Sequence, residues 1–250
     1  MGERADWLRE IAGEKLSWEE SVAEQRRSDI APLHYARICN DTAEVVAATD
    51  PELSIFFDTG HLLSFAPSFL TTSSRYIAHN GFFHRMGWSA SAAVGASIAR
   101  GNRPALALIG DGSFIMGGTA VATAAEQNLP VVWVVMNNRS LQLERELMIR
   151  LYGRESFCDY RKTTTQELWN PDIGKWAEAM GAASMHVGRA EEYAPALRRA
   201  LALRAPVVID VEVSLDIKGY RSIWYPYPTN FHESLTPGPL AAAGSAPGKP

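Results

Sequence analysis

Two oxygen-bearing side chains follow two apolar runs of the sequence, and their types suit a magnesium ion. Asp111 lies between two glycines in the stretch IGDGSF, directly after the run ALAL, and Asn138 ends the run VVWVVMNN. Magnesium takes a few protein oxygens and completes its octahedral shell with phosphate oxygens and water. Gly112 would let a phosphate approach the backbone, and Ser113 adds a hydroxyl and an amide near the start of a helix. The pair predicts a site for a metal-bound phosphate group.

Both stretches can also be simple tight turns, because Asp-Gly and Asn-Asn are common turn formers. The interval between them favours a site instead. The residues from 113 to 137 read as helix, turn and strand, which is the order that one βαβ unit requires. Asp111 and Asn138 would then stand at the ends of two neighbouring strands.

The rest of the chain repeats this alternation of strands and helices. Helices are expected over 32–48, 87–101, 117–130, 171–182 and 189–203, and strands over 53–60, 104–109, 130–138 and 206–213, with a turn at 110–112. Strands separated by helices predict an α/β fold, a parallel sheet with helices on both faces. In such a sheet ligands bind outside the carboxyl ends of the strands, where the stretches DTG, GDG and NN all fall.

Composition excludes several classes of protein. An apolar content of 46% supports a folded core, and the net charge of −4 without a basic stripe gives no support for nucleic-acid binding. Cys39 and Cys158 offer neither a metal-ligand spacing nor a disulfide framework. The sequence has no signal peptide and no apolar run long enough to cross a bilayer, so a cytoplasmic location without membrane contact is expected.

The pattern divides the chain into four parts. Residues 1–29 are expected to form an N-terminal helical extension whose apolar positions are too sparse for a core of its own. Residues 30–215 form the predicted α/β domain. Residues 216–237 are an aromatic and Pro-rich segment that caps the domain, and residues 238–250 are a small, Pro/Gly-rich tail that is expected to be disordered.

The motif GDGSF followed by NN resembles the magnesium-diphosphate motif of thiamine diphosphate enzymes. The stretch from Ile30 to Val213 is similar to the diphosphate-binding domain of the acetolactate synthase and pyruvate decarboxylase group, through the blocks DTGHLL, HNGFFHRMGWSASAAVGA, GDGSFIMGGTAVATAAEQNLPVVWVVMNN, PDIGKWAEAMGA and APVVIDVEV. The resemblance implies thiamine diphosphate and Mg²⁺ as cofactors.

The resemblance also assigns roles to individual residues. Asp111 and Asn138 would be side-chain ligands of the metal, with the backbone carbonyl of Ser140 as a third ligand at a position where the family commonly has glycine. The residues that would contact the cofactor are Gly60, His61, Met86, Gly110, Asp111, Gly112, Ser113 and Asn138. Among them Met86 matches the bulky apolar residue that holds the two rings of the cofactor in a bent conformation.

Some of these residues have a plainer alternative. Met86 could be core filler, and His61 could be an unpaired surface histidine. His79 and His84 either reach the substrate, with His84 as a possible catalytic residue, or are structural or solvated. Leu141, Gln142, Leu143 and Arg145 are candidates for the substrate pocket; related acetolactate synthases often have a tryptophan there, whereas this chain has ERELM. That difference weakens the case for acetolactate as the product.

In the family, a glutamate on a separate pyrimidine-binding domain activates the cofactor, and no part of this sequence resembles that domain. We therefore expect a split enzyme, with a partner subunit that carries the glutamate and a heterotetramer of two copies of each chain. The segment around Trp224, Tyr225 and Tyr227 would pack either on that partner or on its own domain.

The leading functional hypothesis is decarboxylation of a small, pyruvate-like 2-oxo acid and transfer of the acyl carbanion to an acceptor. A decarboxylase subunit of the sulfopyruvate or phosphonopyruvate kind is an alternative, which basic residues near the pocket, such as His61, Arg85 or Arg145, would favour. A subunit of a 2-oxo acid:ferredoxin oxidoreductase is another, although two distant cysteines supply no iron–sulfur cluster. A scaffolding subunit would have no use for Asp111 and Asn138.

Overall fold

The computed structural model describes residues 2–81, 83–155 and 157–217. The predicted cap segment therefore lies almost wholly outside the described residues, and the predicted tail does so entirely. The division of the chain into four parts stays a prediction.

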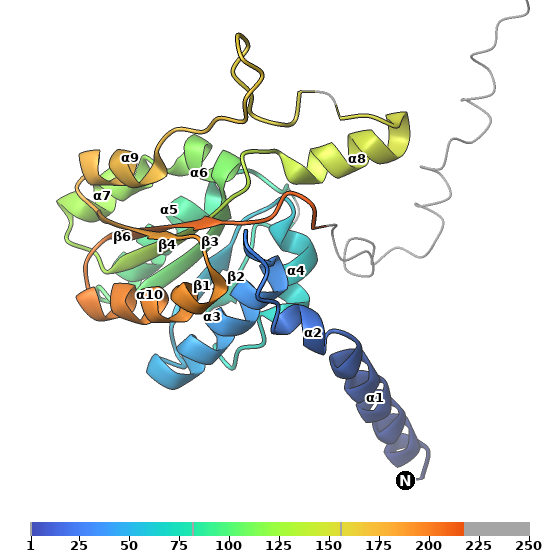
Figure 1. The fold of residues 1–250 in the computed structure, drawn as a ribbon. Helices are drawn as coiled ribbons and strands as arrows, with labels where there is room; N and C mark the ends of the chain where they lie inside the picture. The colour runs from blue at the N-terminus through green and yellow to red at the C-terminus, as the bar shows by residue number, and fades with distance from the viewer. Residues whose placement is uncertain (1, 82, 156, 218–250) are drawn as a thin grey trace, which may run out of the picture.

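In the described residues six strands form one sheet, and every pair of neighbouring strands is parallel (Figure 1). The strands are β1 Ser54–Phe57, β2 Ile77–Ala78, β3 Ala105–Gly110, β4 Val131–Asn137, β5 Ala183–Val187 and β6 Val207–Glu212, in the spatial order β2-β1-β3-β4-β6-β5. The central strands β3, β4 and β6 are almost continuous apolar runs, as expected for strands buried on both faces. The predicted α/β class is confirmed.

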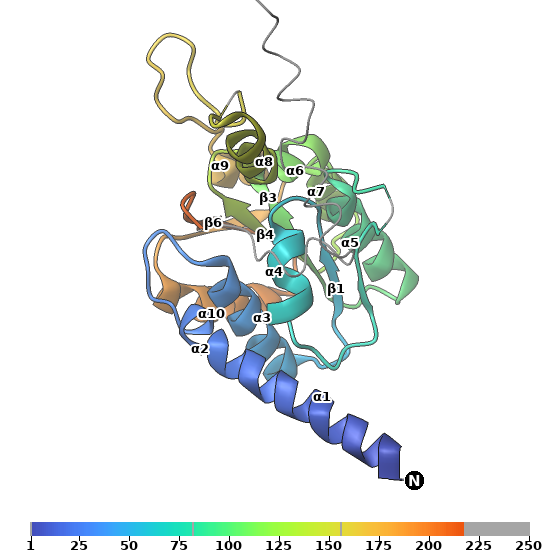
Figure 2. The same ribbon diagram turned by 90° about the vertical axis from the view of Figure 1, so that its right-hand side faces the viewer.

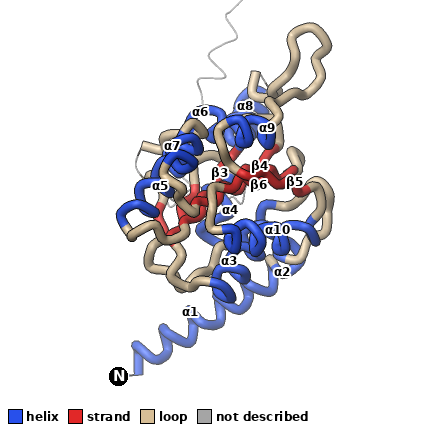
Figure 3. Tube along the Cα trace, turned by 90° about the vertical axis from the view of Figure 1, so that its left-hand side faces the viewer, coloured by secondary structure: helices blue, strands red, loops and turns tan. Residues whose placement is uncertain are grey.

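Helices cover both faces of the sheet, so successive strand residues pack into different cores (Figure 3). Val132 and Val134 join the core beneath α3 (Tyr35–Thr49), α4 (Leu62–Phe69) and α10 (Ala190–Leu203). Trp133 and Val135 join the core beneath α5 (Trp88–Ala99), α6 (Asp111–Gly117), α7 (Ala120–Glu126) and α9 (Ile173–Ala179). The carboxyl edge of the sheet is where loops from both layers meet.

The strand order reverses between β1 and β3, and this opens the sheet at their carboxyl ends. From β1 the chain runs outward to β2 and then returns to β3 on the other side of β1. Phe57 pairs with Leu108, and the Asp58 amide donates to the Leu108 carbonyl at 2.9 Å. Thr59 to His61 therefore lie beside Asp111, at the type of switch point where α/β proteins bind ligands.

Helices α5 and α6 touch through two glycines. Gly87 has φ +83° and lies just before α5, where the Asp58 carboxylate accepts hydrogen bonds from the amides of Gly87 (3.1 Å) and Ser89 (2.8 Å). An ideal Cβ built on Gly117 would lie only 2.7 Å from the Gly87 Cα. The close approach fixes the position of Met86, which precedes Gly87 in the chain.

The N-terminal residues form a long helix, α1 (Gly2–Ser21), and a short one, α2 (Ala23–Arg26). Helix α1 extends away from the sheet and its flanking layers (Figures 1 and 2). Its C-terminal end touches the domain, with the rings of Trp18 and Phe69 5.9 Å apart and Val22 buried. Trp7 and Leu16 are 59% and 62% exposed, in keeping with the sparse apolar pattern of this stretch.

The structure corrects the turn expected at 110–112, because Asp111 is the first residue of helix α6. It also shows helix α8 (Gln142–Tyr152) within the stretch 139–170, for which no helix was predicted. Strands β2 and β5 were not expected from the sequence, because β2 has two exposed residues and β5 has one buried residue in five. In the described part of the chain, none of the helices combines the length and the apolar character needed to span a bilayer.

Candidate functional site

Asp111 is buried where β3 meets α6, and backbone amides surround its carboxylate. Its Oδ1 accepts the Gly112 amide at 2.7 Å, and its Oδ2 accepts the Arg139 amide at 2.6 Å and the Asn170 side chain at 3.3 Å. Burial raises the pKa of the Asp111 carboxyl to about 7, and the hydrogen bonds from the amides of Gly112 and Arg139 oppose that rise. A buried carboxylate of this kind is stabilised in its charged form by a cation.

Asn138 stands at the end of β4 beside Asp111, and both ends of its amide are hydrogen-bonded. Its Oδ1 accepts the Ser140 amide at 2.9 Å. Its Nδ2 donates to the Tyr35 hydroxyl at 2.9 Å and to Gln142 Oε1. The amides of residues 138–140 face the Asp111 carboxylate, so one charged and one neutral oxygen donor are buried close to each other. This donor set fits magnesium.

A cavity of about 280 Å³ opens at this edge of the sheet, and the sequence-predicted site residues meet there. Its lining includes Gly60, His61, His84, Met86, Gly110, Asp111, Gly112, Ser113, Asn138 and Ser140. Three of the four residues predicted for the substrate pocket also line the cavity, namely Leu141, Gln142 and Leu143. The structure thus places residues from four separate stretches of sequence around one space.

His61 is a buried residue, which excludes the surface alternative. Its ring packs beside Tyr35, with centroids 5.1 Å apart, and beside Phe65 at 5.5 Å. Burial lowers the pKa of His61 to about 4, so the imidazole is neutral at pH 7. Its Nε2 lies 3.9 Å from Glu146 Oε1. His61 can therefore offer a neutral hydrogen-bonding group to the cavity but not a positive charge.

The other two histidines considered for the site, His79 and His84, differ in their surroundings. His84 is exposed, has φ +48° and lines the cavity. His79 stacks on Phe57 with ring centroids 4.9 Å apart and is not among the lining residues. Of the two, His84 is the one placed to meet a ligand.

Gly112, in the cavity wall, has no room for a side chain. A Cβ there would lie 2.9 Å from Leu141 Cδ2 and 3.1 Å from Met86 Cε, and closer still to the Tyr160 hydroxyl. Met86 therefore reaches across the cavity to Gly112 and does more than fill the core. Burial, with the Asp111 charge as a second cause, raises the pKa of Tyr160, so this hydroxyl keeps its proton.

We expect Gly112→Ala to fold but to lose about 1–3 kcal/mol of unfolding free energy, the usual range for overpacking, and to bind the cofactor poorly. Tyr160→Phe removes the oxygen nearest the new methyl group, so the alanine should destabilise the Tyr160→Phe protein less than wild type. Urea unfolding of the four proteins of this double-mutant cycle measures the coupling. An equal loss in both backgrounds would show that Tyr160 does not contact position 112.

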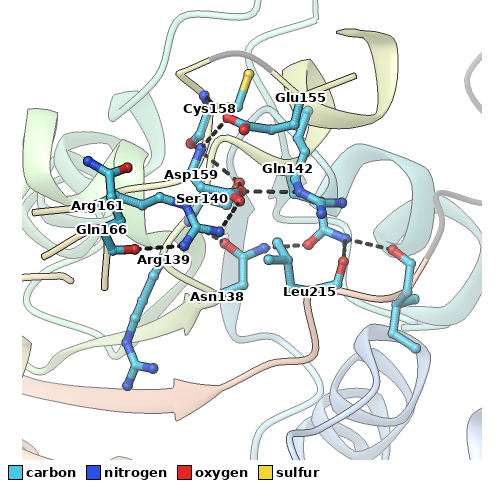
Figure 4. Close-up of polar contacts among 12 residues, drawn as sticks. Asn138, Arg139, Ser140, Gln142, Glu155, Cys158, Asp159, Arg161, Gln166 and Leu215 are labelled. Carbon is cyan, nitrogen blue, oxygen red and sulfur yellow. Dashed lines mark hydrogen bonds and ion pairs between the residues drawn. The ribbon is translucent and has the colours of Figure 1, made fainter. Parts of the chain in front are cut away.

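A hydrogen-bond network ties Ser140, in the loop after β4, to the segment that carries Tyr160 (Figure 4). The Ser140 hydroxyl donates to Asp159 Oδ1 at 2.9 Å, and the Leu141 amide donates to the Cys158 carbonyl at 2.9 Å. Asp159 is buried and pairs with Arg145 at 3.1 Å and Arg161 at 3.0 Å. Arg145, predicted as a pocket residue, therefore faces Asp159 and does not line the cavity.

Sequence reasoning missed two tyrosines of the site. Tyr35 lines the cavity and contacts Asn138 from helix α3, and Tyr160 reaches Gly112 from the segment after α8. Neither lies in a motif. Tyr35 occupies an ordinary apolar position of an amphipathic helix, so no local signal distinguishes it from a core residue.

Comparison with known proteins agrees with this geometry. Residues 58–211 match the family described as thiamine pyrophosphate enzyme, C-terminal TPP binding domain. A putative thiamine pyrophosphate-containing protein of Bacillus subtilis, YdaP, is 30% identical over 198 residues, which cover 78% of this chain and 32% of the relative. The mitochondrial catalytic subunit of acetolactate synthase from Saccharomyces cerevisiae is 27% identical, over 84% of this chain and 30% of the relative.

A sulfoacetaldehyde acetyltransferase from Castellaniella defragrans is 26% identical, over 79% of this chain and 34% of the relative. The chain thus spans about a third of the length of these relatives. The matched segment runs from the end of β1 into β6 and contains Asp111, Asn138 and most of the cavity wall. The chain belongs to the thiamine pyrophosphate enzymes and carries their C-terminal TPP-binding domain.

Proposed function

We propose that this chain is the diphosphate-binding part of an enzyme that uses thiamine diphosphate and Mg²⁺ to decarboxylate a pyruvate-like 2-oxo acid and to transfer the acyl unit to an acceptor. The observation that carries the proposal is that Asp111, at the start of α6, and Asn138, after β4, are buried close to each other beside a cavity wall with no side chain at Gly112. A scaffolding protein would have no need to bury a carboxylate there.

Each residue has a defined part in this proposal. Asp111, Asn138 and the Ser140 carbonyl would hold Mg²⁺, and Gly60, His61, Gly110, Gly112 and Ser113 would surround the diphosphate. Met86 would support the rings of the cofactor from the position that Gly87 fixes. Thiamine diphosphate, when bound, supplies the electron sink that decarboxylation of a 2-oxo acid requires.

We further propose that a second polypeptide supplies the pyrimidine-binding part and the activating glutamate, in a heterotetramer. Two observations support this. The cavity, at about 280 Å³, lies just below the usual range for ligand pockets, about 300–1,000 Å³, so a second surface would be needed to enclose a cofactor. Among the described residues, the glutamate that lines it is Glu144, which is exposed to solvent.

The charges around the cavity support a substrate with a small uncharged side chain. Within the described ranges no lysine or arginine lines it, since Arg145 pairs with buried Asp159 and Arg85 lies outside it. His61 is neutral at pH 7. Among the described residues that line the cavity, a second anionic group on the substrate, as in sulfopyruvate or phosphonopyruvate, would have no lysine or arginine as a partner. This favours the pyruvate type over that alternative.

The test is to co-express the chain with its candidate partner and to measure Mg²⁺-dependent binding of thiamine diphosphate and release of carbon dioxide from pyruvate. We expect binding to require Mg²⁺ and turnover to require both polypeptides. Full turnover by this chain alone would show that no second polypeptide is needed. Equal binding of thiamine diphosphate with and without Mg²⁺ would reject the metal site. Faster turnover of sulfopyruvate than of pyruvate would favour the alternative substrate class.

A further inference from the structure

Gln142 connects the candidate metal ligand Asn138 to the last described residues of the chain. It is the first residue of helix α8, and it is buried. Its Nε2 donates to the carbonyls of Leu215 at 2.8 Å and Ile217 at 2.7 Å, and its Oε1 accepts from Asn138 Nδ2 (Figure 4). Two stretches far apart in sequence therefore meet through one side chain.

The orientation of the Gln142 amide follows from the chemistry of its partners. Backbone carbonyls only accept hydrogen bonds, so the end of Gln142 that faces Leu215 and Ile217 must be its NH₂ group. The opposite end is then Oε1, which only accepts. The end of Asn138 that faces Gln142 must in turn be an NH₂ group, and Asn138 Oδ1 points the other way.

The remaining partners of Asn138 agree with this orientation. The Tyr35 hydroxyl can donate or accept, so it would tolerate either end of the Asn138 amide. The Ser140 amide donates to Asn138 Oδ1 at 2.9 Å and holds this oxygen on the side of the loop whose next amide, that of Arg139, donates to Asp111. Gln142 is thus the side chain that holds the nitrogen end of Asn138 away from the metal position.

We propose that Gln142 is a positioning residue of the metal site, which presents Asn138 Oδ1 to the ion and thereby makes the segment Ser214–Ile217 part of that site. The inference rests on the proposed function, because it needs Asn138 to be a ligand. Residues that orient a metal ligand typically change metal affinity about 10- to 100-fold when they are replaced. By linkage, a bound ion must also stabilise the segment that holds Gln142.

Other contacts also hold the segment Ser214–Ile217: Ile217 packs against the core, and its backbone interacts with His61. The Ser214 amide donates to the Leu33 carbonyl at 3.0 Å, and the Asp216 amide donates to Ser214 Oγ within the segment. The two hydrogen bonds from Gln142 add to these contacts at the carbonyls of Leu215 and Ile217, and their loss should be visible as faster amide exchange.

Three variants separate the two ends of Gln142. Gln142→Met keeps the size of the side chain but neither donates nor accepts as an amide does. Gln142→Glu keeps the acceptor for Asn138 and, when ionised, loses both donors to the carbonyls. Gln127→Leu is the matched control, since Gln127 is exposed at the end of α7, far from the loop. Thermal melts without metal show whether each protein folds.

The experiment uses the full chain with Mn²⁺ and inorganic diphosphate as the probe, which needs no partner subunit. Metal binding is measured by electron paramagnetic resonance, and amide exchange at residues 214–217 by mass spectrometry. We expect Gln142→Met to bind Mn²⁺ about 10- to 100-fold more weakly. Gln142→Glu should bind within about threefold of wild type but lose the metal-induced protection of the segment, and Gln127→Leu should match wild type.

The outcomes distinguish this inference from the proposed function. If wild type does not bind Mn²⁺ with diphosphate, the metal site itself is rejected, and the inference fails with it. If wild type binds and folded Gln142→Met binds equally well, only the positioning role is rejected. Should Gln142→Met not fold, Gln142→Glu decides alone: protection of residues 214–217 that persists without the two donors overturns the inference.

Discussion

Replacing Asp111 with asparagine is expected to weaken Mg²⁺-dependent binding of thiamine diphosphate by at least about 100-fold. Loss of a residue that only orients a metal ligand typically lowers metal affinity about 10- to 100-fold, and loss of a direct ligand should lower it more. Asparagine keeps the shape of the side chain and one oxygen but removes the charge that the ion would neutralise. Calorimetric titration with and without Mg²⁺ measures the change. Asp6→Asn, at an exposed position on α1, is the matched control. Unchanged affinity in Asp111→Asn would refute the metal assignment.

The same substitution replaces one of the two oxygens that accept backbone amides with an NH₂ group, and it should destabilise the unliganded fold less at pH 8 than at pH 5. Burial raises the pKa of Asp111 in the folded state to about 7, above the value of an unfolded aspartate. A group with a raised folded-state pKa contributes stability that is complete below its unfolded pKa and is lost as the pH rises through about 7. At pH 8 wild type therefore carries the full unfavourable effect of an ionised buried carboxylate, and the asparagine variant does not.

Cofactor affinity should change with pH in the opposite direction. Below pH 7 a proton competes with the ion for Asp111, so affinity should fall by up to about tenfold per pH unit between pH 7 and pH 5. Protonation of the diphosphate adds its own pH dependence. Subtracting the profile of Asp111→Asn, or of free diphosphate with Mg²⁺, isolates the contribution of the carboxyl. Identical profiles for the two proteins would show that Asp111 does not titrate in the site.

The fold was predictable wherever a local pattern reflects burial. The apolar runs of β3, β4, β6 and α5 and the periodic helices α3 and α10 can be recognised in the sequence, because buried elements must carry apolar residues, in continuous runs or at fixed spacing. Strand β5 exposes most of its side chains at the sheet edge, and β2 has two residues. Their place in the sheet depends on pairing with distant strands, which the sequence pattern does not encode.

In the candidate site, too, some residues could be predicted from a local pattern and others depend on contacts with distant parts of the chain. Asp111, Gly112 and Asn138 occur in motifs because the chemistry expected of them needs those residue types directly after a strand. The residues that orient them come from elsewhere: Tyr35 is 103 positions from Asn138, and Gln142 is held by carbonyls 73 and 75 positions away. Such partners are selected by contact in the folded chain, and many polar or aromatic residues at the same positions would give equally plausible sequences.

The contact between α5 and α6 leads to the largest expected effect on stability. Gly117→Ala would place a Cβ 2.7 Å from the Gly87 Cα and 3.0 Å from the Gly87 carbonyl carbon. Both neighbours are backbone atoms, so no flexible side chain can move aside, as Tyr160 could at position 112. Gly87 itself is held by the Asp58 carboxylate and by its positive φ. We expect a loss of about 3 kcal/mol or more, at the upper end of the usual effect of overpacking.

The sign of this effect is the decisive part of the prediction, because helix propensity alone would make alanine better than glycine by about 1 kcal/mol inside a helix. Gly95→Ala in α5, where an added Cβ meets nothing within 4 Å, shows that propensity without the clash and should be neutral or stabilising. Urea unfolding of both variants measures the contrast. A Gly117→Ala protein as stable as Gly95→Ala would show that the two helices do not approach this closely. If the contact is real, any Gly117→Ala protein that still folds must move Gly87, and with it Met86, so it should also bind thiamine diphosphate more weakly than Gly95→Ala.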